Sequence, residues 1–155
     1  MKALELKIPP VVVGLIVAVF MWVITRLLPG FRINLPSDTV RLVAIIIATG
    51  GGLFAAAGVW SFQKAQTTVN PTRPDASSSV VTTGVYQVSR NPMYLGMLLV
   101  LTAGAFWLAN ALAFVGLPLF VLYMNRFQIG PEERMLSAKF GEAYQTYQQR
   151  VRRWL

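Results

Sequence analysis

The sequence contains no cysteine and no histidine among its 155 residues. It therefore cannot form a disulfide, a thiolate nucleophile, an imidazole base or a zinc site of the usual ligand types. Any chemistry must come from carboxylates, tyrosine, arginine, amides, backbone dipoles or a reactive cofactor. We accordingly expect no bound metal.

Charged residues are also scarce. They make up 13% of the chain, whereas a soluble domain of this size usually carries about 25%. Hydrophobic residues make up 55% and gather in runs long enough to cross a bilayer. No polar stretch between these runs is long enough to bury a core of its own. The sequence predicts an all-α integral membrane protein with a single domain over residues 1–155.

Four apolar runs alternate with polar connections, and each is predicted to be a transmembrane helix. Their approximate bounds are 8–28, 40–62, 92–109 and 111–127. The last two are short for a hydrocarbon core of about 30 Å, so we expect a short helical hairpin that turns at Asn110 and is kinked or loosened at Pro118. Glycines and alanines in the second run indicate close helix packing.

The polar parts of the chain are a long connection over residues 63–91 and a C-terminal segment. A connection of this length is either functional or disordered. The C-terminal segment is predicted to form an amphipathic helix over residues 131–153 at the membrane surface, weakened locally at Gly141. Its apolar residues recur at steps of three and four and are Leu136, Phe140, Tyr144, Tyr147 and Val151.

The net charge is +8, from 14 basic and 6 acidic residues. No basic module interleaved with aromatics stands apart from the apolar runs, so we expect no nucleic-acid partner and assign the positive charge to membrane lipid headgroups. Eleven of the 14 basic residues lie on the side of the N-terminus, the long connection and the C-terminal segment. The positive-inside rule therefore predicts a multi-pass protein of the cytoplasmic membrane with both termini in the cytoplasm.

Polar side chains flank the predicted hairpin on this side. Arg90, Asn91 and Tyr94 precede or begin the third run, and Glu132 and Glu133 follow the fourth. A cation, an amide, an aromatic ring and two carboxylates together suit a zwitterionic ligand with an ammonium, a carboxylate, ribose hydroxyls and a flat base. Each residue also has a plainer interpretation, as a headgroup contact, an interfacial aromatic or an acidic first turn of a helix.

Two stretches in order, "TGVYQVSRNPMYLG" and "PEERMLSAKFGEAYQTYQQRVRRWL", resemble the C-terminal core of the isoprenylcysteine carboxyl methyltransferase and phospholipid methyltransferase group. The segment "TTVNP" at 67–71 is also similar, so the resemblance covers residues 67–155. The matching positions are Gly84, Tyr86, Arg90, Asn91, Pro92, Tyr94 and Gly96, then Glu132, Glu133, Leu136, Phe140, Gly141, Tyr144, Tyr147, Val151 and Arg153.

The resemblance implies a membrane-embedded enzyme that uses S-adenosylmethionine, held between the hairpin and the C-terminal helix, with a lipophilic substrate entering from the bilayer. Arg90 and Glu133 become the candidate catalytic residues. Two departures stand out: Asn91 replaces a histidine of many members, and "TAGAFW" around Gly104 lacks the second glycine of phospholipid-methylating members. The candidate cofactor-binding residues are Tyr86, Arg90, Asn91, Pro92, Tyr94, Glu132 and Glu133.

Methyl transfer from a sulfonium requires alignment of the reacting atoms and exclusion of water, without a covalent protein intermediate. The acceptor is left open between a carboxylate, which needs no base, and a thiol, an amine or a lipid headgroup. For a protonated acceptor the base would be Glu132 or Glu133. A non-catalytic membrane adaptor with the same fold is the alternative, and a small transporter is disfavoured because the predicted spans lack an ionisable group at mid-membrane.

Overall fold

The computed structural model describes residues 4–34, 36–66 and 79–155, and this part of the chain is helical, as predicted. Within it the only β-type pairing is an isolated bridge between Arg32 and Asn110. The elements in chain order are α1 (Pro10–Leu27), η2 (Pro29–Phe31), α2 (Ser37–Lys64), η4 (Gly84–Gln87), α3 (Pro92–Leu108), η5 (Ala111–Val115), α4 (Gly116–Tyr123), η6 (Met124–Ile129), α5 (Gly130–Phe140) and α6 (Glu142–Arg150).

Within the described residues, three helical stretches are long and apolar enough to cross a membrane, namely α1, α2 and the stretch Ala111–Phe140. The remaining apolar helix, α3, has 17 residues and a length of about 26 Å, somewhat less than a typical hydrocarbon core. The protein is therefore an integral membrane protein with several apolar helices. The number of four spans, and the side of the membrane on which each end lies, stay predictions.

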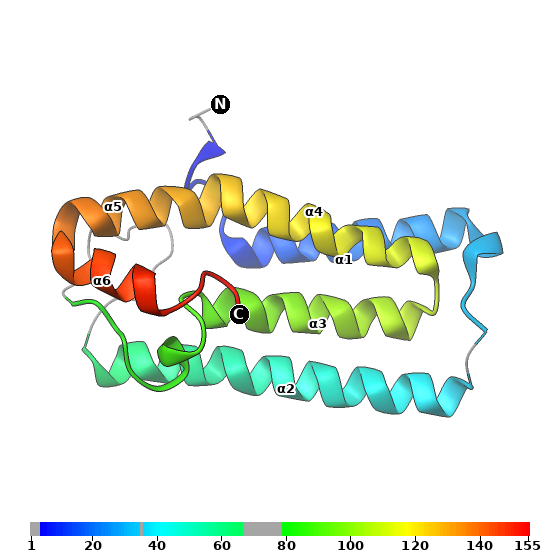
Figure 1. Ribbon diagram of the computed structural model, residues 1–155. Coiled ribbons are helices and arrows are strands. Elements are labelled where there is room, and N and C mark those ends of the chain that lie inside the picture. The colour runs from blue at the N-terminus through cyan, green and yellow to red at the C-terminus, as the bar shows by residue number, and fades with distance from the viewer. Residues whose placement is uncertain (1–3, 35, 67–78) are drawn as a thin grey trace.

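Helix α3 lies at the centre of the bundle (Figure 1), where it contacts α1, α2 and α4. Buried side chains from α1, α3, α4 and η6 form one core, which includes Met21, Leu101, Phe120 and Met124. The outward faces of α1 and α2 expose many large apolar side chains, as expected for helices surrounded by lipid.

Helices α2 and α3 pack with their backbones in contact, as the glycines of the second run predicted. A Cβ atom added to Gly96 would lie 2.5 Å from the carbonyl oxygen of Gly51 and 2.7 Å from the Cβ of Ala55. A Cβ added to Gly51 would lie 2.8 Å from the carbonyl oxygen of Gly96. Neither position has room for a side chain, so these glycines set the distance between the two helices.

The fourth helical stretch differs from the prediction in where it loosens. Pro118 lies in the first turn of α4, directly after the 3-10 helix η5. The widened turn comes later, over the six residues of η6, which form a π-helix. Such turns are rare and are frequently found at functional sites. The helix then continues without a break into α5, so residue 127, the predicted end of the fourth span, is not an end of the helix.

The C-terminal segment forms two helices instead of the single predicted one over 131–153. The chain turns at Gly141, whose φ of +55° is a backbone conformation that favours glycine, and α6 folds back beside the loop before α3 (Figure 1). The apolar stripe faces protein: Tyr144, Tyr147 and Val151 are buried against Val81 and Tyr86. These side chains are therefore covered by the loop and not by the membrane surface.

At the opposite end of the bundle, Asn110 fastens the hairpin turn. Its side chain is fully buried, donates a hydrogen bond from Nδ2 to the carbonyl oxygen of Leu28 at 3.0 Å, and accepts one from the N–H of Leu112 at 2.9 Å. The N–H of Ile33 adds a bond to the carbonyl of Ala109 at 2.8 Å. One side chain thus ties the end of α1 to the turn between α3 and η5.

We expect Asn110→Ala to lower the free energy of unfolding by about 1–3 kcal/mol, because it removes a buried side chain and leaves the carbonyl of Leu28 and the N–H of Leu112 without their partner. The exposed Asn34 offers a matched control, and Asn34→Ala should leave stability within about 0.5 kcal/mol of the parent. Denaturant unfolding in detergent micelles measures both. Equal stability of the two variants would contradict this role for Asn110.

Candidate functional site

The predicted site residues meet at one end of the bundle, where α3 begins and α4 passes into α5 (Figure 1). Pro92 is the first residue of α3, a position where its fixed φ and missing N–H are tolerated. Glu132 and Glu133 lie in the first turn of α5. The helical hairpin returns the chain to its starting end, so the two sequence motifs become neighbours in space, as expected.

Glu133 forms a buried ion cluster with two arginines. Its Oε1 lies 3.0 Å from Nη2 of Arg90 and accepts a hydrogen bond from Nε of Arg153 at 3.1 Å, while its Oε2 accepts one from Nη2 of Arg153 at 2.5 Å. The side chains of Arg90 and Glu133 are 11% and 13% exposed, and that of Arg153 is 37% exposed. The hydrogen bonds that Arg153 donates to Glu133 raise the pKa of Arg153 above its ordinary value. We call this set the Arg–Glu–Arg cluster.

Glu132 lies in a different environment, with neutral donors on one of its oxygens. Its Oε1 accepts a hydrogen bond from the hydroxyl of Tyr94 at 2.6 Å and another from Nε2 of Gln128. Its Oε2 accepts no hydrogen bond from the described part of the chain. Two adjacent carboxylates therefore have separate surroundings: Glu133 is held by cations and Glu132 by a phenol and an amide.

Gln128 was not predicted as a site residue, although it is 2% exposed and its Nε2 lies 3.4 Å from the hydroxyl of Tyr94. It belongs to η6, the π-helical stretch that interrupts the regular helix. A signal was present in the sequence, because a glutamine stands directly after the fourth apolar run and one helical turn before Glu132. Its burial could not be read from that spacing alone.

The last part of the chain is fastened across the start of α3. The N–H of Arg90 donates to the carbonyl of Arg152 at 3.0 Å, and Nδ2 of Asn91 donates to the carbonyl of Arg153 at 2.9 Å. The indole N–H of Trp154 donates to Oδ1 of Asn125 at 3.0 Å. We call residues 152–154 the C-terminal strap. Asn91 thus has a defined task in this chain: its amide holds the strap.

Tyr86 is buried in the aromatic cluster beside the site and is not in the Arg–Glu–Arg cluster itself. Its backbone carbonyl accepts a hydrogen bond from the hydroxyl of Tyr147 at 2.7 Å, and its ring meets Phe62 edge to face at 5.2 Å. Burial raises the pKa of Tyr86, Tyr144 and Tyr147 well above the ordinary value, so all three phenols are neutral at physiological pH. They can donate hydrogen bonds but do not add negative charge.

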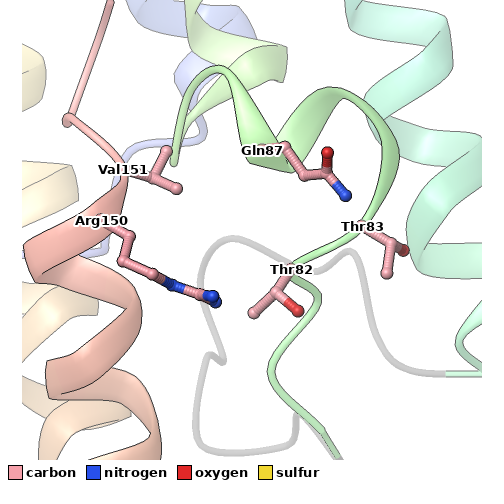
Figure 2. A pocket seen from close by; sticks show the side chains of 5 residues that line it. All are labelled: Thr82, Thr83, Gln87, Arg150 and Val151. Atoms are coloured by element: carbon pink, nitrogen blue, oxygen red, sulfur yellow. The ribbon is translucent and has the colours of Figure 1, made fainter.

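A pocket of about 450 Å³ opens between the loop before α3 and the end of α6 (Figure 2). Thr82, Thr83 and Gln87 line it from one side, and Arg150 and Val151 line it from the other. The predicted site residues are not among its lining residues. However, the loop that forms one side of the pocket continues along the chain to Arg90, and α6 on the other side continues to Arg153. The hydrogen bond from the N–H of Arg90 to the carbonyl of Arg152 joins this loop to the C-terminal strap. The predicted motif "TTVNP" at 67–71 lies outside the described residues.

The model of the phospholipid methyltransferase family matches residues 40–143, which include most of α2, all of α3 and the helical stretch through α5. A protein of Haemophilus influenzae, itself described as uncharacterized, is 52% identical over 63 residues; the match covers 41% of this chain and all of the relative. No solved structure matches significantly.

Proposed function

Because the chain belongs to the phospholipid methyltransferase family, and is thus placed among membrane methyltransferases, we propose that it transfers the methyl group of S-adenosylmethionine to a lipophilic acceptor that reaches it from the bilayer. The observation that carries the proposal is the meeting of Arg90, Tyr94, Glu132 and Glu133 at the start of α3 and α5. The acceptor class stays open between a carboxylate, a thiol, an amine and a lipid headgroup.

The residues fit this cofactor in chemistry and in size. A pocket of 450 Å³ is within the range of about 300–1,000 Å³ that holds small ligands. Its hydroxyl and amide groups on Thr82, Thr83 and Gln87 suit the hydroxyls and ring nitrogens of a nucleoside. The charged groups of the Arg–Glu–Arg cluster, next along the chain, suit the amino-acid end of the molecule. Pro92 and Asn91 support this arrangement by fixing the start of α3 and the C-terminal strap.

When bound, the cofactor supplies a methyl group on a sulfonium, which is its own leaving group. The chain must hold the donor and the acceptor in line and exclude water. Tyr94 and Gln128 hold one oxygen of Glu132, and its other oxygen is available to take the proton of an amine or thiol acceptor. We assign Glu132 to that task, because both oxygens of Glu133 are paired with arginines. A carboxylate acceptor would need no such base.

The test is calorimetric binding of S-adenosylmethionine and S-adenosylhomocysteine to the purified protein, first in detergent and then in lipid nanodiscs. We expect binding by the parent, and a loss of at least about tenfold for Arg90→Ala and Glu133→Gln, measured where each variant is still folded, because each removes a buried charge from the ligand's surroundings. No binding by a folded parent in both media would remove the methyltransferase proposal. Binding without methylation of any lipid extract would favour the adaptor.

A further inference from the structure

Segments from both ends of the chain meet at η6. The C-terminal strap reaches it through Trp154, whose indole N–H donates to Asn125. The segment before α1, at residues 4–8, lies against it as well (Figure 1), and we call this segment the N-terminal latch. The N–H of Leu6 in the latch donates to the carbonyl of Phe127 at 3.0 Å. The π-helical stretch is therefore held by two segments that are distant from each other in the sequence.

The bond from Leu6 compensates for a donor that Pro131 lacks. In a regular α-helix, the carbonyl of Phe127 would accept a hydrogen bond from the N–H four residues later. That residue is Pro131, which has no N–H. The N–H of Leu6 supplies a donor in its place, with Leu6 in a backbone conformation of φ +58°. This conformation is unfavourable for a residue with a side chain and persists only where surrounding contacts hold it.

Glu5, the neighbour of Leu6, supplies such contacts. Its Oε1 accepts a hydrogen bond from Nη1 of Arg126 at 3.3 Å, and its Oε2 accepts one from Nη2 of Arg134 at 2.5 Å. Arg126 belongs to η6 and Arg134 to α5, so one carboxylate bridges the two elements. The side chain of Glu5 is only 15% exposed, although it lies near the start of the chain. The bridge therefore restricts the movement of η6 relative to α5.

The same two elements carry the candidate proton acceptor. Gln128 of η6 and Glu132 of α5 share hydrogen bonds with Tyr94. Within η6 the N–H of Gly130 bonds to the carbonyl of Asn125, five residues earlier, as in a π-helix. A regular helix turns by about 100° per residue, so a return of this turn to α-helical bonding would change the direction of Glu132 by about that angle. The contact with Tyr94 thus depends on the register of η6.

We propose that Glu5 is a positioning residue of the candidate site: by bridging Arg126 and Arg134, it holds η6 and α5 in the register that places Glu132 beside Tyr94. The role of Glu132 as a proton acceptor rests on the function proposed above, whereas the register of η6 does not. Glu5 acts through the two arginines, on the side of η6 that the latch covers.

The experiment is fluorine NMR of the full chain in detergent micelles, with fluorotyrosine in place of tyrosine. The chain has five tyrosines, and the signal of Tyr94 is identified by its loss in Tyr94→Phe. A fluorine next to the ring hydroxyl reports the hydrogen bond from Tyr94 to Glu132. Glu5→Gln keeps the size of the side chain and removes its charge. We expect this variant to move the Tyr94 signal by more than its line width.

Three tyrosines of the aromatic cluster serve as internal controls. They are buried beside the loop before α3 and are Tyr86, Tyr144 and Tyr147. Their signals should stay in place in Glu5→Gln, which also shows that the variant is folded. Hydrogen exchange measured by mass spectrometry gives a second, local readout. The amides of η6 should exchange about 3- to 10-fold faster in Glu5→Gln, as expected for the loss of ion pairs whose arginines are about half exposed.

Further variants test the route through the arginines. Arg126→Gln together with Arg134→Gln should move the Tyr94 signal as Glu5→Gln does, and adding Glu5→Gln to this pair should cause no further shift. Asp38→Asn removes an exposed carboxylate at the opposite end of the bundle and should leave every tyrosine signal in place.

The outcomes are distinct. An unmoved Tyr94 signal in Glu5→Gln would overturn the positioning role, whatever the exchange rates of η6. Movement of the three control signals together with that of Tyr94 would mean general loosening and would overturn it as well. A further shift on adding Glu5→Gln to the arginine pair would exclude the proposed route. If the parent fails to bind S-adenosylhomocysteine, the methyltransferase proposal fails, while the NMR result still decides on Glu5.

Discussion

Gly96→Ala should lower the free energy of unfolding by about 3 kcal/mol, whereas Gly104→Ala, eight residues further along the same helix, should raise it by about 0.5–1 kcal/mol. The added methyl group is the same in both variants. At Gly96 it would lie 2.5 Å from a backbone oxygen of α2, and at Gly104 it would meet nothing within 4 Å. A backbone oxygen cannot rotate out of the way as a flexible side chain can. The alanine at position 96 therefore forces α2 and α3 apart.

The pair is measured by denaturant unfolding in mixed micelles, with helix content followed by circular dichroism. The sign of the stability change at Gly96 tests the backbone contact, because helix propensity alone would make alanine more stable than glycine at both positions. A stability gain at both positions would contradict direct backbone contact between α2 and α3. A loss at both would mean that the space around Gly104 is filled, against the structure.

The second large effect concerns Glu133. We expect Glu133→Gln to cost about 3–5 kcal/mol of unfolding free energy, because it removes the anion between two arginines and leaves Arg90 largely buried without a counter-charge. Arg153 is more exposed and can turn its guanidinium toward water. The cost should therefore come chiefly from Arg90, at the start of α3.

A double variant separates stability from binding. Arg90→Met with Glu133→Leu replaces the buried pair by apolar side chains of similar size, and such replacements are often neutral or stabilising. It should recover most of the stability lost in Glu133→Gln and still fail to bind S-adenosylhomocysteine. Thermal unfolding and calorimetry on the same samples test both parts. Recovered binding in the double variant would show that the ion cluster is not a ligand site.

The sequence predicted the bundle well because lipid makes strong demands on composition. The predicted runs 8–28, 40–62 and 92–109 correspond to α1, α2 and α3, and each predicted bound lies within about three residues of the observed one. The glycines of α2 correctly indicated close packing, since small residues are what allow helices to approach in a membrane. Asn110 was correctly expected at the turn of the hairpin.

The rest depended on contacts that no local pattern specifies. A helix period cannot tell whether Tyr144 and Tyr147 meet lipid or protein, and here the loop before α3 covers them. No proline lies within η6, so the sequence did not mark the place of this π-helical turn. The bond from Asn91 to Arg153 joins residues 62 positions apart, so spacing gave no sign of the C-terminal strap. The motifs named residues that the fold brings together at the start of α3 and α5, while the pairing of their charges required the fold.

The touching backbones of Gly51 and Gly96 also have a mechanical consequence. Two helices in such contact cannot slide past each other without first separating, so α2 and α3 move as one rigid body. The C-terminal strap is held to the start of α3 by the bond from Asn91, to η6 by the bond from Trp154, and to α5 by the partly exposed guanidinium of Arg153, which water can replace. We therefore expect any opening for a ligand to come from movement of the strap, while α2 and α3 stay together.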